Sequence, residues 1–138
     1  MKAFPLKIVT PDGVLFDGQA EELVVRTTSG DTGILADHIN YVAPLGMGQA
    51  TVVLVDGKRR YGACIGGMVS VVNGEVTLVP TTFEWSENID VDRAMVSKER
   101  AEKILSDKSS SDTDILLAKA RLKRALVRSG VAGSRKYF

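Results

Sequence analysis

The sequence predicts an all-β N-terminal domain, a sandwich or flattened barrel of about eight to ten strands, followed by an antiparallel two-helix hairpin. Two observations support this fold class. Residues 4 to 82 form short apolar or alternating runs rich in Val, Ile, Leu and Thr, separated by turn residues and without a helical period. After Glu87 the apolar residues recur with the period of a helix. The predicted domains are therefore residues 1–87 and 88–138.

Turn residues set the expected strand boundaries. Asp56-Gly57 and Asn73-Gly74 each join two strand-like runs, and both dipeptides favour type I′ hairpin turns. Gly66-Gly67 is expected between strands, where backbone segments approach closely. Cys64 lies in an apolar run and has no second cysteine for an internal disulfide. We therefore expect Cys64 in the core of a protein from a reducing compartment.

The first helix is expected to begin after Asp90, in the hexamer Ile89-Asp90-Val91-Asp92-Arg93-Ala94. An aspartate at this position accepts a hydrogen bond from a free N–H of the first turn. The apolar stripe that follows ends near Ser106, and residues 107–111 are polar. These residues predict a short connection between two antiparallel helices.

The second helix is expected to be capped by Asp112 or Asp114 and to end at Gly130 and Gly133. The apolar stripes of the two helices consist of Val91, Ala94, Met95, Ala101, Ile104 and Leu105, and of Ile115, Ala118, Leu122, Ala125 and Leu126. Both stripes are narrow and rich in alanine, so the hairpin buries little area. A hairpin of marginal stability suits a conformational switch.

Charge is unevenly distributed between the two predicted domains. Residues 1 to 87 carry six Lys/Arg against ten Asp/Glu, a balance of −4. Residues 88 to 138 carry twelve against seven, a balance of +5. The helical part is therefore suited to a phosphate-bearing ligand or an acidic protein surface.

The sequence argues against several classes of function. His38 is the only histidine and no G-x-S-x-G turn is present, so we expect no catalytic residue. One His and one Cys do not supply an ordinary zinc site, so no metal site is expected. The glycines do not form the G-x-x-x-x-G-K-[ST] pattern of a P-loop. No apolar run approaches the roughly 18 residues of a membrane span, and the N-terminus lacks the apolar run of a secretory signal.

Several motifs follow one another in a specific order. Gly30-Asp31-Thr32-Gly33-Ile34-Leu35 is followed by His38, then by Gly66-Gly67, and the hexamer at residues 89–94 opens the helical part. In this order and spacing the whole chain resembles the ε subunit of rotary F-type ATP synthase, of the bacterial or chloroplast type. The chain departs from the family pattern around His38. Many relatives have Pro-Gly or similar small residues before this histidine and Ala-Pro-Leu after it, whereas this chain has Ala36-Asp37 before it and a Pro-Leu pair only at residues 44 and 45.

The resemblance implies a non-catalytic subunit of the central stalk of the proton-translocating ATP synthase. The β domain would dock on the γ subunit and the c-ring, and the extended hairpin would reach the catalytic α and β subunits and inhibit ATP hydrolysis. Candidate partner contacts are His38, Arg121 and Lys123, with Arg124 and Arg128 beside them. The protein would lie peripherally at the cytoplasmic face of the bacterial cell membrane.

The resemblance also implies that the compact hairpin binds ATP as a regulatory ligand, with no cofactor required. Ile89, Asp90, Arg93 and Ala94 match the family motif I(L)-D-x-x-R-A. The candidate ATP-binding residues are Glu84, Asp90, Arg93, Arg100, Arg124 and Arg128. Guanidinium groups donate charge-assisted hydrogen bonds to phosphates, and a carboxylate accepts from an adenine amino group or a ribose hydroxyl.

Two other interpretations stay open. Arginines on exposed helices are usually solvated or paired with carboxylates, so Asp90 and Arg93 would then form only a cap and a local ion pair. The alternative function is a nucleic-acid-binding β-barrel protein with a basic tail at residues 134–138. The acidic β part and its few aromatic residues weaken that alternative, because such proteins need a positive groove lined by aromatic side chains.

Overall fold

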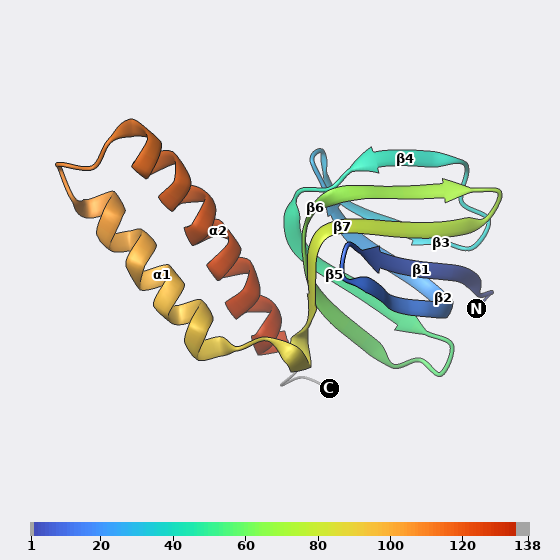
Figure 1. Ribbon diagram of the computed structural model, residues 1–138. Coiled ribbons are helices and arrows are strands. Elements are labelled where there is room, and N and C mark those ends of the chain that lie inside the picture. Colours follow the sequence, from blue (N-terminus) through green and yellow to red (C-terminus); the bar gives the residue numbers. More distant parts are fainter. Residues whose placement is uncertain (1, 135–138) are drawn as a thin grey trace.

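A helical hairpin projects from one end of a β-sandwich in the computed structural model, which describes residues 2–134 (Figure 1). The strands are β1 (Phe4–Thr10), β2 (Gly13–Thr27), β3 (Gly30–Leu35), β4 (Tyr41–Pro44), β5 (Met47–Leu54), β6 (Arg59–Val72) and β7 (Glu75–Trp85). A short 3-10 turn, η1 (Ser86–Asn88), leads into α1 (Val91–Ser106) and α2 (Asp112–Ser134). The predicted fold class is confirmed. Residues 135–138 of the predicted basic tail lie outside the described residues.

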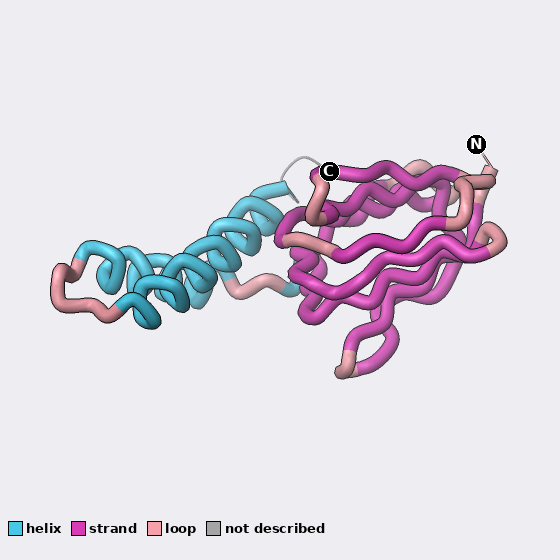
Figure 2. Tube along the Cα trace, turned by 90° about the horizontal axis from the view of Figure 1, so that it is seen from above, coloured by secondary structure: helices cyan, strands magenta, loops and turns pink. Residues whose placement is uncertain are grey.

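The sheet runs β1-β7-β6-β5-β2-β3, with β4 paired to β6. Because β1 also pairs with β2, the strands close into a flattened barrel, seen from above in Figure 2. The described residues form seven strands, fewer than the number predicted. The number of strands is smaller than predicted because single long strands run through both layers of the sandwich. Strand β2, for example, pairs with β1 as far as Ala20, and from there on with β5 and β3.

Strand β6 bends at Gly66-Gly67, which lie inside the strand and not between strands as predicted. Their φ angles are 66° and 96°, in the left-handed region that favours glycine. A Cβ on Gly67 would overlap the carbonyl oxygen of Val79. On one side of the bend β6 pairs with β5 and on the other with β4, so the bend turns a corner of the sandwich.

The core fills the space between the two layers. Its largest fully buried side chains include Leu6, Ile8, Leu23, Val25, Ile34, Val52, Val69, Val71 and Leu78. They alternate with outward-facing residues along their strands, as a half-buried sheet requires. Cys64 belongs to this core, and burial raises the pKa of its thiol to about 12. The prediction that Cys64 is a core residue is confirmed.

One of the two predicted type I′ turns is present. Asn73 and Gly74 have φ angles of 49° and 82°, the positive values that this turn requires. At Asp56-Gly57 the prediction was wrong, because only Gly57 has a positive φ, 84°. The loop there has three residues, with Gly57 N–H donating to Leu54 O (2.9 Å) and Leu54 N–H to Lys58 O (2.8 Å). A hairpin of this length combines an ordinary turn with a left-handed glycine.

The boundaries of α1 agree with the sequence prediction. Asp90 is the N-cap, and its Oδ1 accepts a hydrogen bond of 3.0 Å from Arg93 N–H. The helix ends at Ser106, and the polar connection of residues 107–111 follows. Asp107 begins this connection by accepting from the backbone N–H and the hydroxyl of Ser109.

Both predicted boundaries of α2 were wrong. Ser111 caps the helix in place of Asp112 or Asp114, since Asp114 N–H donates to Ser111 Oγ (3.1 Å) and Asp114 Oδ2 accepts from Ser111 N–H (3.4 Å). This reciprocal pair is a capping box with aspartate at its third position. At the other end the helix continues past Gly130 and Gly133 to Ser134. The reason is tertiary packing, because Val131 and Ala132 are buried there.

The two helices pack through small side chains. Ala94, Ala101, Ala118 and Ala125 are all at most 2% exposed and recur at intervals of seven residues on each helix. Alanine brings two helix backbones close together but buries little apolar area per residue. Several long apolar side chains of the hairpin are exposed, among them Leu116 at 70% and Leu117 and Leu126 at 50%. The alanines of the two predicted stripes are confirmed as the seam, but Val91, Met95 and Leu126, which were predicted to belong to the stripes, are exposed.

Candidate functional site

The candidate site lies where the hairpin joins the sandwich. A small apolar cluster holds the junction, formed by Ala63 of β6, Ile89 of the linker, and Val131 and Ala132 of α2. Ile89, which opens the family motif, is only 5% exposed. The cluster is separate from the sandwich core. The end of α2 is therefore fixed to the sandwich, whereas the far end of the hairpin projects away from it (Figures 1 and 2).

Glu84 and Arg128 form an ion pair across this junction. Arg128 Nε lies 2.7 Å from Glu84 Oε1, and Arg128 Nη2 donates to Glu84 Oε2 at 3.2 Å. The buried Nε–H does not point at the oxygen, so the bond from Nη2 is the aligned hydrogen bond of the pair. The side chains are 20% exposed for Arg128 and 37% for Glu84. Two of the predicted ATP-binding residues are thus brought into direct contact with each other.

Asp90 and Arg93 lie at the start of α1, six and nine residues beyond Glu84. The Asp90 carboxylate caps the helix through Oδ1, and both residues are exposed. Within residues 2–134 the Arg93 guanidinium makes no ion pair. Arg93 is therefore available to an anion beside the N-terminus of α1, where the helix dipole also favours negative charge.

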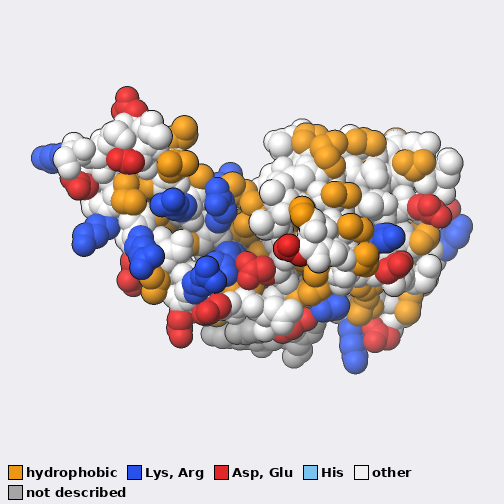
Figure 3. All heavy atoms as spheres, in the orientation of Figure 1, with side chains coloured by type: hydrophobic (Ala, Val, Ile, Leu, Met, Phe, Trp, Pro, Cys, Tyr) orange, Lys and Arg blue, Asp and Glu red, His pale blue; other side chains and the backbone are white. Residues whose placement is uncertain are grey.

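The way the two antiparallel helices align brings Arg100 of α1 and Arg124 of α2 to about the same level of the hairpin. Ser129 Oγ of α2 lies 3.9 Å from Met95 Sδ of α1, which fixes the level at which the antiparallel helices cross. Arg100 is five residues after Met95, and Arg124 is five residues before Ser129. Because the helices are antiparallel and both rise ~1.5 Å per residue, these two arginines lie at about the same level. Both side chains are exposed. The structure thus gathers arginines of both helices over neighbouring levels of the hairpin, and basic side chains are seen along it in Figure 3.

Arg124 also borders a groove between α2 and the bent corner of the sandwich. The groove has a volume of about 500 Å³ and is lined by Leu45, Gly46, Met47, Ile65, Gly66, Thr81, Thr82, Lys123 and Arg124. Lys123 was predicted to contact a partner protein, and in this conformation it lies beside the sandwich. Arg121, the other basic candidate of α2, is exposed and does not line the groove.

Sequence reasoning missed Arg60 as part of the junction. Its guanidinium lies over the ring of Trp85, 3.7 Å from the centroid, and Nη2 donates to Glu87 Oε1 at 2.7 Å. Burial raises the pKa of the Glu87 carboxyl, but the hydrogen bond from Arg60 and smaller contributions outweigh burial and leave the pKa below its ordinary value. No local sequence signal marks Arg60, because its position beside Trp85 follows from the register of the sheet, in which Gly62 pairs with Trp85.

His38 lies far from the junction in the loop between β3 and β4. Its ring packs edge-on against Tyr41 with centroids 5.6 Å apart, and Nδ1 lies 2.7 Å from Ile39 O. The preceding residue, Asp37, has a φ of 64° and pairs with Lys2. The connection from β3 to β4 lies at the end of the sandwich away from the hairpin (Figure 1), so His38 does not join the hairpin residues in one site.

Groups of metal ligands and helices that could span a membrane are two further features that bear on the class of function. Within the described part of the chain no three His, Cys, Asp or Glu side chains are grouped so as to hold a metal ion. None of the described helices is both long enough and apolar enough to cross a membrane.

The family models match the two halves of the chain separately. Residues 3–86 match "ATP synthase, Delta/Epsilon chain, beta-sandwich domain", and residues 87–133 match "ATP synthase, Delta/Epsilon chain, long alpha-helix domain".

Curated relatives align along nearly the whole chain. The ATP synthase epsilon chain of Bacillus velezensis is 44% identical over 134 residues, which are 97% of this chain and 100% of that protein. The epsilon chain of Caldanaerobacter subterraneus is 38% identical over 131 residues, 95% of this chain and 94% of that protein.

Solved structures share the fold. A chain of the Euglena gracilis mitochondrial ATP synthase superposes with a TM-score of 0.83 at 21% identity, covering 93% of this chain and 80% of that one. A chain of the Tetrahymena thermophila mitochondrial ATP synthase central stalk and c-ring gives 0.64 at 14% identity, covering 93% and 95%. At such low identities these similarities concern the fold alone.

Proposed function

The chain belongs to the delta/epsilon family of ATP synthase subunits, and from this premise we propose that it is a non-catalytic, regulatory subunit. In this proposal the hairpin inhibits ATP hydrolysis when it extends, and bound ATP stabilises the folded form. The sandwich docks on the γ subunit and the c-ring, and the extended hairpin reaches the catalytic α and β subunits. The subunit is then peripheral to the membrane, at the cytoplasmic face of a bacterial cell.

The way the hairpin is attached carries the proposal. Helix α1 packs against α2, and the hairpin is held to the sandwich by the apolar cluster around Val131 and by the pair of Arg128 with Glu84. Release of the hairpin breaks these contacts but leaves the sandwich core intact, because the two apolar clusters are separate. The sequence thus builds a stable domain and an appendage whose docking has only a modest free energy.

Exposed apolar side chains support a protein partner for the hairpin. Leu116, Leu117 and Leu126 keep half or more of their surface in contact with water in the folded form. Such residues on a helix with many basic neighbours are suited to a surface that offers both apolar contact and carboxylates. Arg121, Lys123, Arg124 and Arg128 would supply the charges, and His38 would belong to the separate docking surface of the sandwich.

The arrangement of the arginines supports the ATP site. Arg93, Arg100 and Arg124 are exposed and make no ion pair within residues 2–134. A triphosphate among them would replace mutual repulsion by charge-assisted hydrogen bonds. The Asp90 carboxylate and the Glu84 carboxylate would accept from the base or ribose, with Arg128 partly released from Glu84. A ligand that binds only the folded form stabilises it by roughly 2.7 kcal/mol at a hundredfold excess over Kd.

A calorimetric titration of the full-length chain with ATP tests this proposal. Saturable binding should be lost or weakened at least about tenfold in Arg93→Ala and in Arg100→Ala, because each removes one charge-assisted contact. Lys119→Ala removes an exposed positive charge from α2 outside this set and serves as the matched control. Absence of heat at millimolar ATP, or equal losses in all three variants, would overturn the ATP site.

The regulatory role needs a separate measurement. ATP hydrolysis by the catalytic complex is compared with and without the subunit, with the wild type and with a chain shortened after Glu87. Inhibition by the wild type that is absent with the shortened chain supports the proposal, and equal rates contradict it. No observation of the described residues favours the alternative of nucleic-acid binding, because the groove beside α2 is not lined by aromatic side chains.

A further inference from the structure

The groove beside α2 has the size and composition of a small-molecule site. Its volume of about 500 Å³ falls within the range of ligand pockets. Leu45, Met47 and Ile65 form an apolar floor, and Lys123 and Arg124 border it from the helix. An adjoining section of about 400 Å³ shares Met47 and Lys123 and extends along the sandwich. The hollow between hairpin and sandwich is visible in Figure 3.

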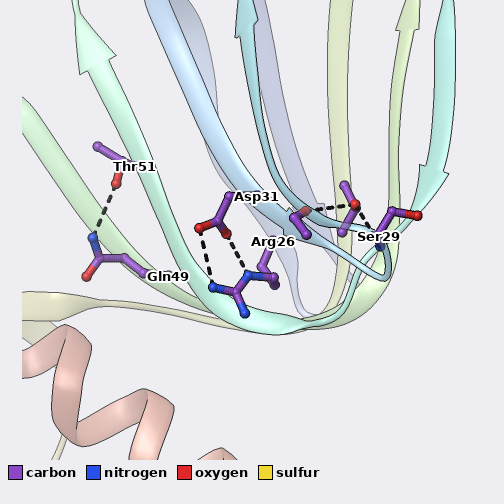
Figure 4. Close-up of polar contacts among 7 residues, drawn as sticks. Arg26, Ser29, Asp31, Gln49 and Thr51 are labelled. Atoms are coloured by element: carbon purple, nitrogen blue, oxygen red, sulfur yellow. Dashed lines mark hydrogen bonds and ion pairs between the residues drawn. The ribbon is translucent and has the colours of Figure 1, made fainter.

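The groove carries an uncompensated positive charge. Neither section is lined by an acidic residue among residues 2–134. Arg26, which lines the adjoining section, is neutralised by Asp31 through a contact of 2.6 Å from Nε to Oδ1 (Figure 4). Lys123 and Arg124 have no such partner in the described part of the chain. Their two charges therefore face the groove without a counter-charge and favour an anion.

Hydroxyl donors stand opposite these charges. Thr82 lines the groove from β7, is exposed, and its hydroxyl makes no hydrogen bond within residues 2–134. Thr28 has the same character in the adjoining section. Phosphate oxygens accept hydrogen bonds from both hydroxyl and cationic groups. The combination of an apolar floor with cationic and hydroxyl donors is that of a site for an organic phosphate and not for a purely apolar molecule.

We propose that this groove binds a small organic phosphate, with its phosphate between Lys123, Arg124 and Thr82 and its apolar body on Met47 and Ile65. The groove shares Arg124 with the proposed ATP site, whereas Lys123, Thr82, Met47 and Ile65 belong to the groove alone and Asp90 and Arg93 do not line it. Arg128, one turn beyond Arg124, does not line the groove and turns instead to Glu84. A ligand in the groove contacts α2 and the sandwich together, so it holds the hairpin down from a second position.

The test uses adenosine monophosphate as the probe, because it combines a single phosphate with a planar ring. It is titrated into the full-length, isotope-labelled chain while amide signals are followed by NMR. The expected result is saturable shifts of the amides around Leu45 to Met47 and of Ile65. Thr82→Trp, which fills the groove from an exposed strand position, should abolish them, and Lys123→Ala should weaken binding about tenfold. Val79→Trp and Lys119→Ala, exposed positions outside the groove, are the matched controls.

The outcomes separate this site from the proposed ATP site. Binding that survives Arg93→Ala but is lost in Thr82→Trp supports the groove, whatever the ATP titration gives. Shifts confined to residues 89–94, or equal affinity in the wild type, Thr82→Trp and Lys123→Ala, would overturn it. Inorganic phosphate is the second probe, and binding as tight as that of adenosine monophosphate would contradict a role for the apolar floor. No shift at millimolar concentrations of either probe also overturns the proposal.

Discussion

Glu84 near the end of β7 and Arg128 near the end of α2 are 44 residues apart in the sequence and meet in an ion pair of 2.7 Å. The pair connects the sandwich directly to the hairpin. It stands beside the apolar cluster of Ile89, Val131 and Ala132, which shields it in part from water. The contact between these two side chains is therefore part of the free energy that holds the hairpin down.

Removal of either partner should loosen the hairpin. We expect Glu84→Gln and Arg128→Ala each to reduce the free energy of hairpin docking by about 1 to 2 kcal/mol, because the half-buried pair is screened less than a surface pair. Hydrogen exchange of the α2 amides should accelerate accordingly, while exchange in the core strands stays unchanged.

A double-mutant cycle gives the contribution of the pair itself. The combined variant should lose less than the sum of the single losses, by about 1 kcal/mol. The pair of Lys98 and Glu102 is the matched control, because both residues lie on α1, one turn apart at 3.8 Å, and make no contact across the junction. Glu102→Gln should change docking by less than ~0.5 kcal/mol. Additive losses in the cycle would contradict a direct role for the ion pair.

The alanine seam should not tolerate larger side chains. Ala125 is 2% exposed between the helices, so Ala125→Leu has no room and should separate them at a cost of about 1 to 3 kcal/mol. Lys119→Leu adds the same side chain at an exposed position of α2 and should leave the hairpin intact. Thermal unfolding followed by helical circular dichroism measures both variants. Equal unfolding of Ala125→Leu and the wild type would mean that the helices do not pack through this seam.

The sequence predicted elements whose signal is local and missed those decided by distant contacts. The cap at Asp90 and the turn at Asn73-Gly74 depend on neighbouring residues and were predicted correctly. The end of α2 was wrong because Val131 and Ala132 pack on residues of β6 and the linker, which outweighs the low helix propensity of two glycines.

The same limit applies to the candidate site. The family resemblance predicted Glu84 and Arg128 as two separate residues that bind ATP. Only the fold shows that their side chains pair with each other. Arg60 was missed because its partners Trp85 and Glu87 are reached through the register of a sheet. Strand number was overestimated for a related reason, since a strand that bends into both layers has the pattern of two strands.

Gly67 should be the least replaceable glycine of the bend in β6. In Gly67→Ala the new Cβ would overlap the carbonyl oxygen of Val79, in addition to the strain of a positive φ. We expect a loss of more than ~2 kcal/mol in the free energy of unfolding. Gly74→Ala is the matched control, because its φ is also positive, 82°, but a Cβ there meets open space. It should lose only about 1 kcal/mol, and equal losses in urea unfolding would refute the steric argument.

The pair of Arg60 and Glu87 should make stability depend on pH in the acidic range. The pKa of Glu87 in the folded protein is below its ordinary value of about 4.3, because the hydrogen bonds, chiefly from Arg60, outweigh burial. A lowered folded pKa means that the ionised form stabilises the fold above the unfolded pKa, and that this contribution disappears as the pH falls through the folded pKa. Glu87→Gln removes the contribution at every pH.

The difference in unfolding free energy between the wild type and Glu87→Gln should therefore be largest at neutral pH and should vanish in acid. Its size at neutral pH is at most about 1 kcal/mol, because the Glu87 side chain is half exposed. The pair of Arg26 and Asp31, whose carboxyl pKa is also lowered, is present in both proteins and cancels in the difference. Urea unfolding at a series of pH values from neutral to about 3 measures the difference directly. A difference that stays constant, or that grows on acidification, would show that Glu87 is not held ionised by Arg60.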